Sequence, residues 1–139
     1  MRYYTLKERQ QEEVNNFPMM FAFSKKQLEQ GCEKLGVKDA ESELYSIGAG
    51  GFIRRDDSKE FDALVNRLSD EMEEALKDYD FLKDALRYEL DNHEYCITMD
   101  PERALNALGF TLEDVKNNDQ LRQALNEVAS KIKIRQEIR

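Results

Sequence analysis

Apolar residues recur every three to four positions along most of the chain, a spacing typical of side chains that share one face of an α-helix. The pattern runs through residues 61–76, 82–90 and 121–132. With only six glycines and two prolines among 139 residues, the sequence leaves little room for long loops. Helices therefore have to supply most of the hydrophobic core.

Residues that commonly begin helices precede several of these segments. Thr5, Ser24 and Asp57 each stand three residues before a glutamate or glutamine, which is the spacing of a capping box or its aspartate variant. Asp100 before Pro101 indicates another helix start, since proline is favoured at the first helical position. The sequence also predicts a C-terminal amphipathic helix over residues 119–139.

Three stretches predict β-strands instead. Residues 17–23 are apolar and aromatic, residues 44–53 hold two apolar pairs around a glycine-rich turn, and residues 95–98 are short and rich in β-prone side chains. Pro18 places the start of the first stretch at a sheet edge. Helical segments separate the three stretches. We therefore predict an α+β fold, a helix-dominated single domain over residues 1–139 with a small two- or three-stranded sheet.

The composition favours a cytoplasmic protein that has no membrane partner. No window approaches the roughly 18 apolar residues that a membrane span requires, and the N-terminus carries no apolar signal-peptide core. Cys32 and Cys96 lie far apart and belong to no Cys-x-x-Cys pair, which indicates two free thiols, although a disulfide stays open. No motif predicts a cofactor, and we expect none.

Charge is distributed unevenly along this chain, whose net charge is −8. Residues 56–94 contain 14 acidic and five basic side chains, a net charge of −9, whereas four of the last nine residues are basic. Such an acidic stretch argues against direct nucleic-acid binding, which needs clustered lysine and arginine. Two interpretations remain. It is either a solvated helix face or a surface that binds a basic protein, for which the candidates are Glu71, Glu73, Glu74, Asp78 and Asp84.

Half of the glycines lie in one run, at Gly48, Gly50 and Gly51. Glycine permits positive φ angles and close backbone approach, which phosphate-binding loops use. The run contains no Gly-Lys-Ser/Thr and no Gly-x-Gly-x-x-Gly. It is interpreted either as a tight turn between two strands or as a loop that touches a ligand or partner.

The only histidine, His93, lies one helical turn after Glu89. Their register with the apolar face of residues 82–90 predicts that both face the interior and pair. A carboxylate beside an imidazole is also a candidate ligand or acid–base site, to which Asn92 could contribute. Cys96 could be a third metal ligand, but zinc sites normally have a more regular set, so we expect no metal site. With one histidine and no Gly-x-Ser-x-Gly motif, we assign no catalytic residue.

Four sequence runs together resemble a known family. They are residues 21–27 (Phe-Ala-Phe-Ser-Lys-Lys-Gln), 46–53 (Ser-Ile-Gly-Ala-Gly-Gly-Phe-Ile), 88–95 (Tyr-Glu-Leu-Asp-Asn-His-Glu-Tyr) and 104–109 (Ala-Leu-Asn-Ala-Leu-Gly). In this order they resemble a family of small uncharacterised proteins encoded by phages and mobile elements of gut-type bacteria. The resemblance covers residues 17–109 and leaves the first and last helices outside. It implies a genomic setting and no particular activity.

Two functions from different classes agree with these observations. The first is a non-enzymatic accessory protein of a phage or mobile element whose acidic helices bind a basic surface on a host protein. A nucleic-acid-binding defence enzyme is one such target, which the protein would inhibit. The alternative is a small-ligand binder or enzyme whose pocket is formed by the glycine turn and the corner of Glu89, Asn92 and His93.

Overall fold

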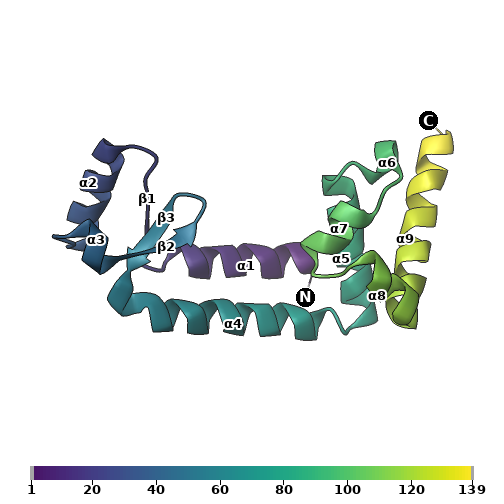
Figure 1. Ribbon diagram of the computed structural model, residues 1–139. Coiled ribbons are helices and arrows are strands. Elements are labelled where there is room, and N and C mark those ends of the chain that lie inside the picture. The colour runs from purple at the N-terminus through teal and green to yellow at the C-terminus, as the bar shows by residue number, and fades with distance from the viewer. Residues whose placement is uncertain (1, 139) are drawn as a thin grey trace. The chain divides into compact units, whose positions relative to one another are not determined.

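The computed structural model describes the backbone of residues 2–138 and the side chains of residues 2–132 (Figure 1). Helices dominate, and three short strands form one antiparallel sheet, which confirms the predicted α+β class. The helices are α1 (Tyr3–Asn15), α2 (Lys25–Leu35), α3 (Ala40–Glu43), the 3-10 turn η1 (Arg55–Asp57), α4 (Ser58–Ala75), α5 (Tyr79–Asn92), α6 (Tyr95–Thr98), α7 (Glu102–Ala107), α8 (Leu112–Asn117) and α9 (Asp119–Ile138). The strands are β1 (Met20–Phe21), β2 (Leu44–Gly48) and β3 (Gly51–Arg54).

The chain divides into two compact units. The helical unit comprises Met1–Glu8 and Glu71–Arg139, and the sheet unit comprises Arg9–Asp70. Both α1 and α4 contribute residues to each unit. The prediction of a single domain over residues 1–139 stays a prediction, and the two units are described separately below.

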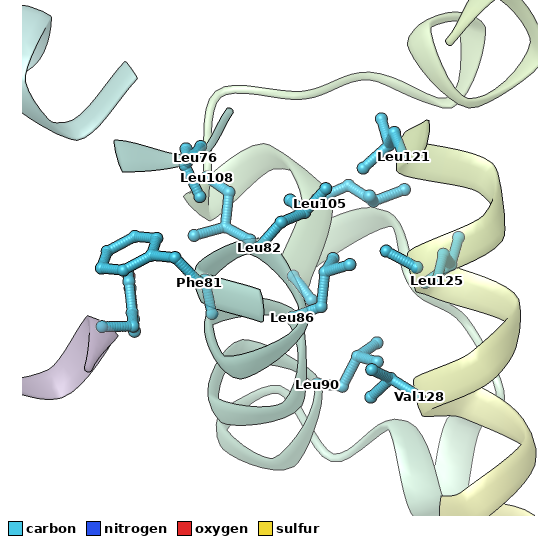
Figure 2. Packing of buried hydrophobic residues seen from close by; sticks show 14 of the residues in the cluster. Leu76, Phe81, Leu82, Leu86, Leu90, Leu105, Leu108, Leu121, Leu125 and Val128 are labelled. Atoms are coloured by element: carbon cyan, nitrogen blue, oxygen red, sulfur yellow. The ribbon is translucent and has the colours of Figure 1, made fainter. Parts of the chain in front are cut away.

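The helical unit is built around α5, which packs against α7 and α9. Leu86 and Leu90 of α5 point toward Leu125 and Val128 of α9, and Leu105 comes from α7 (Figure 2). All five side chains are buried. Because these residues are spaced three or four apart, each helix places them on one face, as the sequence predicted. The predicted C-terminal helix is confirmed as α9, while the basic side chains of Lys133, Arg135 and Arg139 lie outside the described residues.

In the sheet unit the strand order is β1-β3-β2. Strands β2 and β3 form the predicted hairpin over residues 44–53. Met20 and Leu44 lie on the sheet face that α2 covers, together with Val37, which follows α2. Helix α2 begins as predicted, because the Ser24 hydroxyl accepts a hydrogen bond from the Gln27 amide at 3.2 Å.

Two strand predictions need correction. Residues 95–98 form the single helical turn α6 instead of a strand. Its backbone amides bond to carbonyls one turn back, including Met99 to Tyr95 at 2.8 Å, so the segment needs no strand partner. Over residues 17–23 only Met20–Phe21 is a strand, because Phe17 turns away to pack its ring against Phe61 at 5.3 Å.

Candidate functional site

One buried charge marks the helical unit. Asp78 begins α5 by accepting a hydrogen bond from the Phe81 amide at 3.0 Å. The buried face of the helix then continues to Glu89, which is 1% exposed. It is the one buried charged side chain among those that the structure describes. A carboxylate in this position requires several hydrogen-bond donors to stay ionised.

Two hydrogen-bond donors and one imidazole surround the Glu89 carboxylate. Its Oε1 accepts hydrogen bonds from the Tyr3 hydroxyl at 2.6 Å and from Lys7 Nζ at 2.9 Å, and its Oε2 lies 3.3 Å from His93 Nε2. Burial by itself raises the pKa of Glu89, but the hydrogen bonds from Tyr3 and Lys7 and the charges of Lys7 and His93 outweigh it, so the pKa lies below the ordinary value. Glu89 is therefore held as an anion.

Aromatic rings enclose this cluster. The ring of Tyr88 lies 5.4 Å from that of Tyr3 and 5.8 Å from that of Tyr4, measured between centroids. The Lys7 ammonium sits 5.1 Å from the Tyr88 ring centroid, within the range of a cation–π contact. Burial, followed by the hydrogen bond to Glu89, raises the pKa of Tyr3. The cluster thus fastens the first turns of α1 to α5 within the helical unit.

The predicted pairing of Glu89 with His93 is confirmed, although His93 is only half-buried. Asn92 is exposed at the last position of α5. No buried side-chain nitrogen or oxygen among the described residues lacks a partner. This arrangement stabilises the fold, and the chemistry visible here is that of a structural ion cluster.

The acidic candidates divide by environment. Asp78 is the helix cap just described, and Asp84 is half-buried and accepts a hydrogen bond from the Tyr3 amide at 2.8 Å. Glu73 and Glu74 are exposed, and Glu74 pairs with Lys77 at 2.9 Å. Glu71 is half-buried. Two of the five candidates therefore use their carboxylates to build the helical unit.

Sequence reasoning missed two acidic residues that matter here. Asp80 is exposed in the first turn of α5, 3.8 Å from Lys83. Glu127 of α9 accepts a hydrogen bond from the Tyr79 hydroxyl at 2.7 Å and lies 3.6 Å from Lys83. These residues border a hollow of about 250 Å³ between α5 and α9 that three basic and three acidic side chains line together with Val128. The contacts of Glu127 join α9 to α5, so they left no local signal in the sequence, whereas the pairing of Asp80 with Lys83 is one helical turn and local.

The glycine run forms the turn between β2 and β3 in the sheet unit. Gly48, Ala49 and Gly50 all have positive φ angles, of 89°, 52° and 79°. The tight-turn interpretation therefore describes its structure, and the pairing of β2 with β3 shifts register between Ser46 and Gly48. Glu89, Asn92 and His93 belong to the helical unit, so the two halves of the predicted ligand pocket come from different units.

The described residues also bear on three other features: a metal site, a disulfide and a membrane-spanning helix. Among them no three side chains of His, Cys, Asp or Glu gather closely enough to hold a metal ion. Cys32 and Cys96 are not joined in a disulfide; both are half-buried, and each unit contains one of them. None of the described helices is both long and apolar enough to cross a membrane.

Fold and site together define a small α+β protein with a buried, hydrogen-bonded carboxylate and exposed acidic side chains around the α4–α5 connection. The chain belongs to a family of unknown function, DUF7659, whose family model matches residues 2–131. The match includes α1 and most of α9, so it extends beyond the residues 17–109 to which the four sequence runs confined the resemblance. Neither the curated proteins nor the solved structures contain a significant match to this chain.

Proposed function

We propose that this protein is a non-enzymatic accessory protein of a phage or mobile element that binds a basic surface on a host protein. The observation that carries the proposal is the acidic connection, defined as residues 71–80. It contains five carboxylates and one ammonium group, and its side chains Glu73, Glu74 and Asp80 are exposed. The phage or mobile-element setting rests on the resemblance of the four sequence runs.

The short length of the connection concentrates this charge. Helix α4 ends at Ala75 and α5 begins at Tyr79, so only three residues separate the two helices. The carboxylates in the last turn of α4 therefore lie close in sequence to those at the start of α5. Lys77 offsets part of this charge through its ion pair with Glu74, and Lys83 lies 3.8 Å from Asp80. The pKa of Lys77 is raised, first by its hydrogen bond to Glu74 and then by the charge of that residue. The side chains of Glu73 and Asp80 stay exposed on either side of this pair, where they would attract a cationic surface.

A basic surface that normally binds nucleic acid would suit this arrangement. Arginine and lysine side chains that contact phosphates recognise carboxylates by the same charge-assisted hydrogen bonds. Electrostatic attraction between oppositely charged surfaces raises the association rate more than it strengthens the final complex. Inhibition would follow if the protein occupied the channel of a nucleic-acid-binding defence enzyme.

The test is to capture partners from a host lysate on immobilised protein and to identify them by mass spectrometry. The test variant carries Glu73→Lys, Glu74→Lys and Asp80→Lys. The control variant makes the same change in charge at exposed positions of the sheet unit, Glu29→Lys, Glu33→Lys and Glu41→Lys. The captured protein is then purified, and its association rate is measured at low and high salt.

We expect the test variant to reduce the association rate by roughly tenfold or more at low salt, and much less at high salt, where screening is strong. The control variant should bind as the wild type does. Both variants should melt near the wild-type temperature, because exposed charges contribute little to stability. If all three proteins bind the captured partner at equal rates at both salt concentrations, the acidic connection is only a solvated surface.

A further inference from the structure

One face of the three-stranded sheet packs against α2, and the opposite face buries Ile53 but leaves aromatic side chains exposed beside it. Directly paired residues of antiparallel strands share a face, and alternate residues along a strand do the same. Met20, Ala22 and Leu44 therefore face α2. Phe21 and Tyr45 lie on the opposite face, where they are 56% and 43% exposed.

Phe23 extends this aromatic face just beyond β1. Its ring lies next to Gly50, the neighbour of the residue on which the Phe21 ring rests, and it is 76% exposed. The solvent face of an antiparallel sheet normally carries polar residues. Exposed aromatic side chains on and beside a sheet face are instead typical of a protein-binding surface. The aromatic face is defined here as Phe21, Phe23 and Tyr45.

The glycine turn holds the two phenylalanine rings in place. A Cβ atom on Gly50 would lie 2.4 Å from the Phe23 ring, and one on Gly51 would lie 3.0 Å from the Phe21 ring. The rings therefore rest directly on glycine backbone. The Ala22 amide donates to the Gly50 carbonyl at 2.9 Å and the Phe23 amide donates to Gln27 Oε1 at 2.7 Å, so the backbone between the rings is fixed as well. Rings ordered before binding lose less conformational entropy when a partner arrives.

Two lysines border the aromatic face where α2 begins. Lys25 and Lys26 occupy the first turn of this helix, immediately after Phe23 and the cap Ser24. Both are exposed, and neither forms an ion pair with the described part of the chain. A first turn normally favours acidic residues, because the helix dipole is positive there. This end of α2 thus has uncompensated positive charge beside exposed aromatic rings.

We propose that the aromatic face with Lys25 and Lys26 is a docking surface for an acidic protein segment with apolar anchor residues. The rings would contact the anchors, and the two lysines would pair with carboxylates beside them. Charge complementarity decides the occupant. Nucleic acids and anionic membranes present extended negative charge and would be repelled by a chain of net charge −8. A short segment bound at this face interacts electrostatically mainly with charges within a Debye length of about 8 Å. Both lysines are among these charges.

This surface is independent of the acidic connection, because it lies in the sheet unit and selects the opposite charge. To test it, a random peptide library is displayed and selected against the whole wild-type chain. Enriched peptides are synthesised, and their affinities are measured by fluorescence polarisation. We expect them to combine aromatic or aliphatic residues with neighbouring aspartate or glutamate.

Two test variants separate the apolar and the charged contributions. They are Phe21→Ser with Phe23→Ser, and Lys25→Glu with Lys26→Glu. Each has a matched control. Ile97→Ser removes an apolar side chain that is 75% exposed in the helical unit, and Lys38→Glu with Lys59→Glu makes the same change in charge elsewhere in the sheet unit. Each test variant should weaken peptide binding by roughly tenfold or more, and the controls should not.

Several results would overturn the proposal. They include the absence of enriched peptides, enriched peptides without acidic residues, and equal binding by either test variant and its control. Sedimentation of the protein with phosphatidylserine vesicles, or a dimer that Phe23→Ser dissociates, would identify a different occupant and also refute it. Circular dichroism confirms that each variant is folded. The lysine variant alters only exposed charge, so it keeps the test decisive if the phenylalanine variant unfolds.

Discussion

The substitution Tyr3→Phe tests whether the Glu89 cluster holds the helical unit together. It removes a single oxygen atom and keeps the ring, which packs against Phe81 and Tyr88. The hydroxyl it removes donates to Glu89 at 2.6 Å, with both side chains buried. The change therefore isolates one hydrogen bond to a buried charge.

The expected cost follows from the structure. A hydrogen bond to a charged group contributes about 1.5–3 kcal/mol. Lys7 remains as a donor to Glu89 and His93 remains in contact with it, but the Lys7 side chain is half-exposed, so its contribution is screened by solvent. We expect the free energy of unfolding to fall by about 2 kcal/mol. For 139 residues that unfold in one transition, this corresponds to a decrease in Tm of roughly 7 °C.

Tyr4→Phe is the matched control. The Tyr4 hydroxyl donates to Glu8 at 2.9 Å, but that pair is exposed, so its loss should leave Tm unchanged. Both variants are measured by thermal and urea unfolding, followed by circular dichroism. A double-mutant cycle of Tyr3→Phe with Glu89→Gln should give a coupling energy of about 1–2 kcal/mol. If the Tyr3 and Tyr4 variants melt at the same temperature, the cluster does not stabilise this unit.

Three further predictions concern the described residues. The folded-state pKa of Glu89 lies below its ordinary value of 4.5, so the cluster adds stability that is fully present above pH 4.5 and is lost as the pH falls through the folded-state pKa. Urea titrations at decreasing pH should show this loss of stability. The Glu89→Gln variant should lose less stability over the same pH range. Gly50→Ala and Gly48→Ala should each cost about 1–2 kcal/mol in urea unfolding for their positive φ angles, and Gly50→Ala should cost more, since its Cβ would overlap an aromatic ring. Leu86→Ala should cost about 2–5 kcal/mol by opening a cavity in the core, whereas Leu112→Ala, at an exposed position, should cost less than about 0.5 kcal/mol; equal costs in calorimetry would contradict the packing described.

Elements whose structure depends on a local residue pattern could be predicted from the sequence. The apolar spacing of α5 and α9 produces a buried stripe on each helix, and burying both stripes requires the two helices to pack together. The same register placed Glu89 on the buried side and His93 one turn later, so their pairing could be predicted. Glycines between two apolar pairs predicted the hairpin for a similar local reason.

Where contacts between distant residues decide the structure, local signals failed. Thr5 carries the capping spacing, yet α1 begins at Tyr3, because the carboxylate of Asp84, 81 residues away, accepts the Tyr3 amide. The β-prone residues of α6 fold into a helical turn because Tyr95 is buried in the core of the helical unit. The aromatic face also escaped prediction, since which side of the sheet α2 covers is a tertiary choice.

The acidic stretch illustrates why composition alone cannot locate a binding surface. Its net charge of −9 suggested one continuous face, but its carboxylates divide into two groups by what they contact. Asp78, Asp84 and Glu89 accept hydrogen bonds that the helical unit needs, so reversing their charge would remove fold stability together with any binding. Glu73 and Asp80 are exposed, and reversing them changes the electrostatic potential while leaving the packing intact. An association rate that responds to the second group alone would therefore report recognition, whereas a response confined to the first would report unfolding.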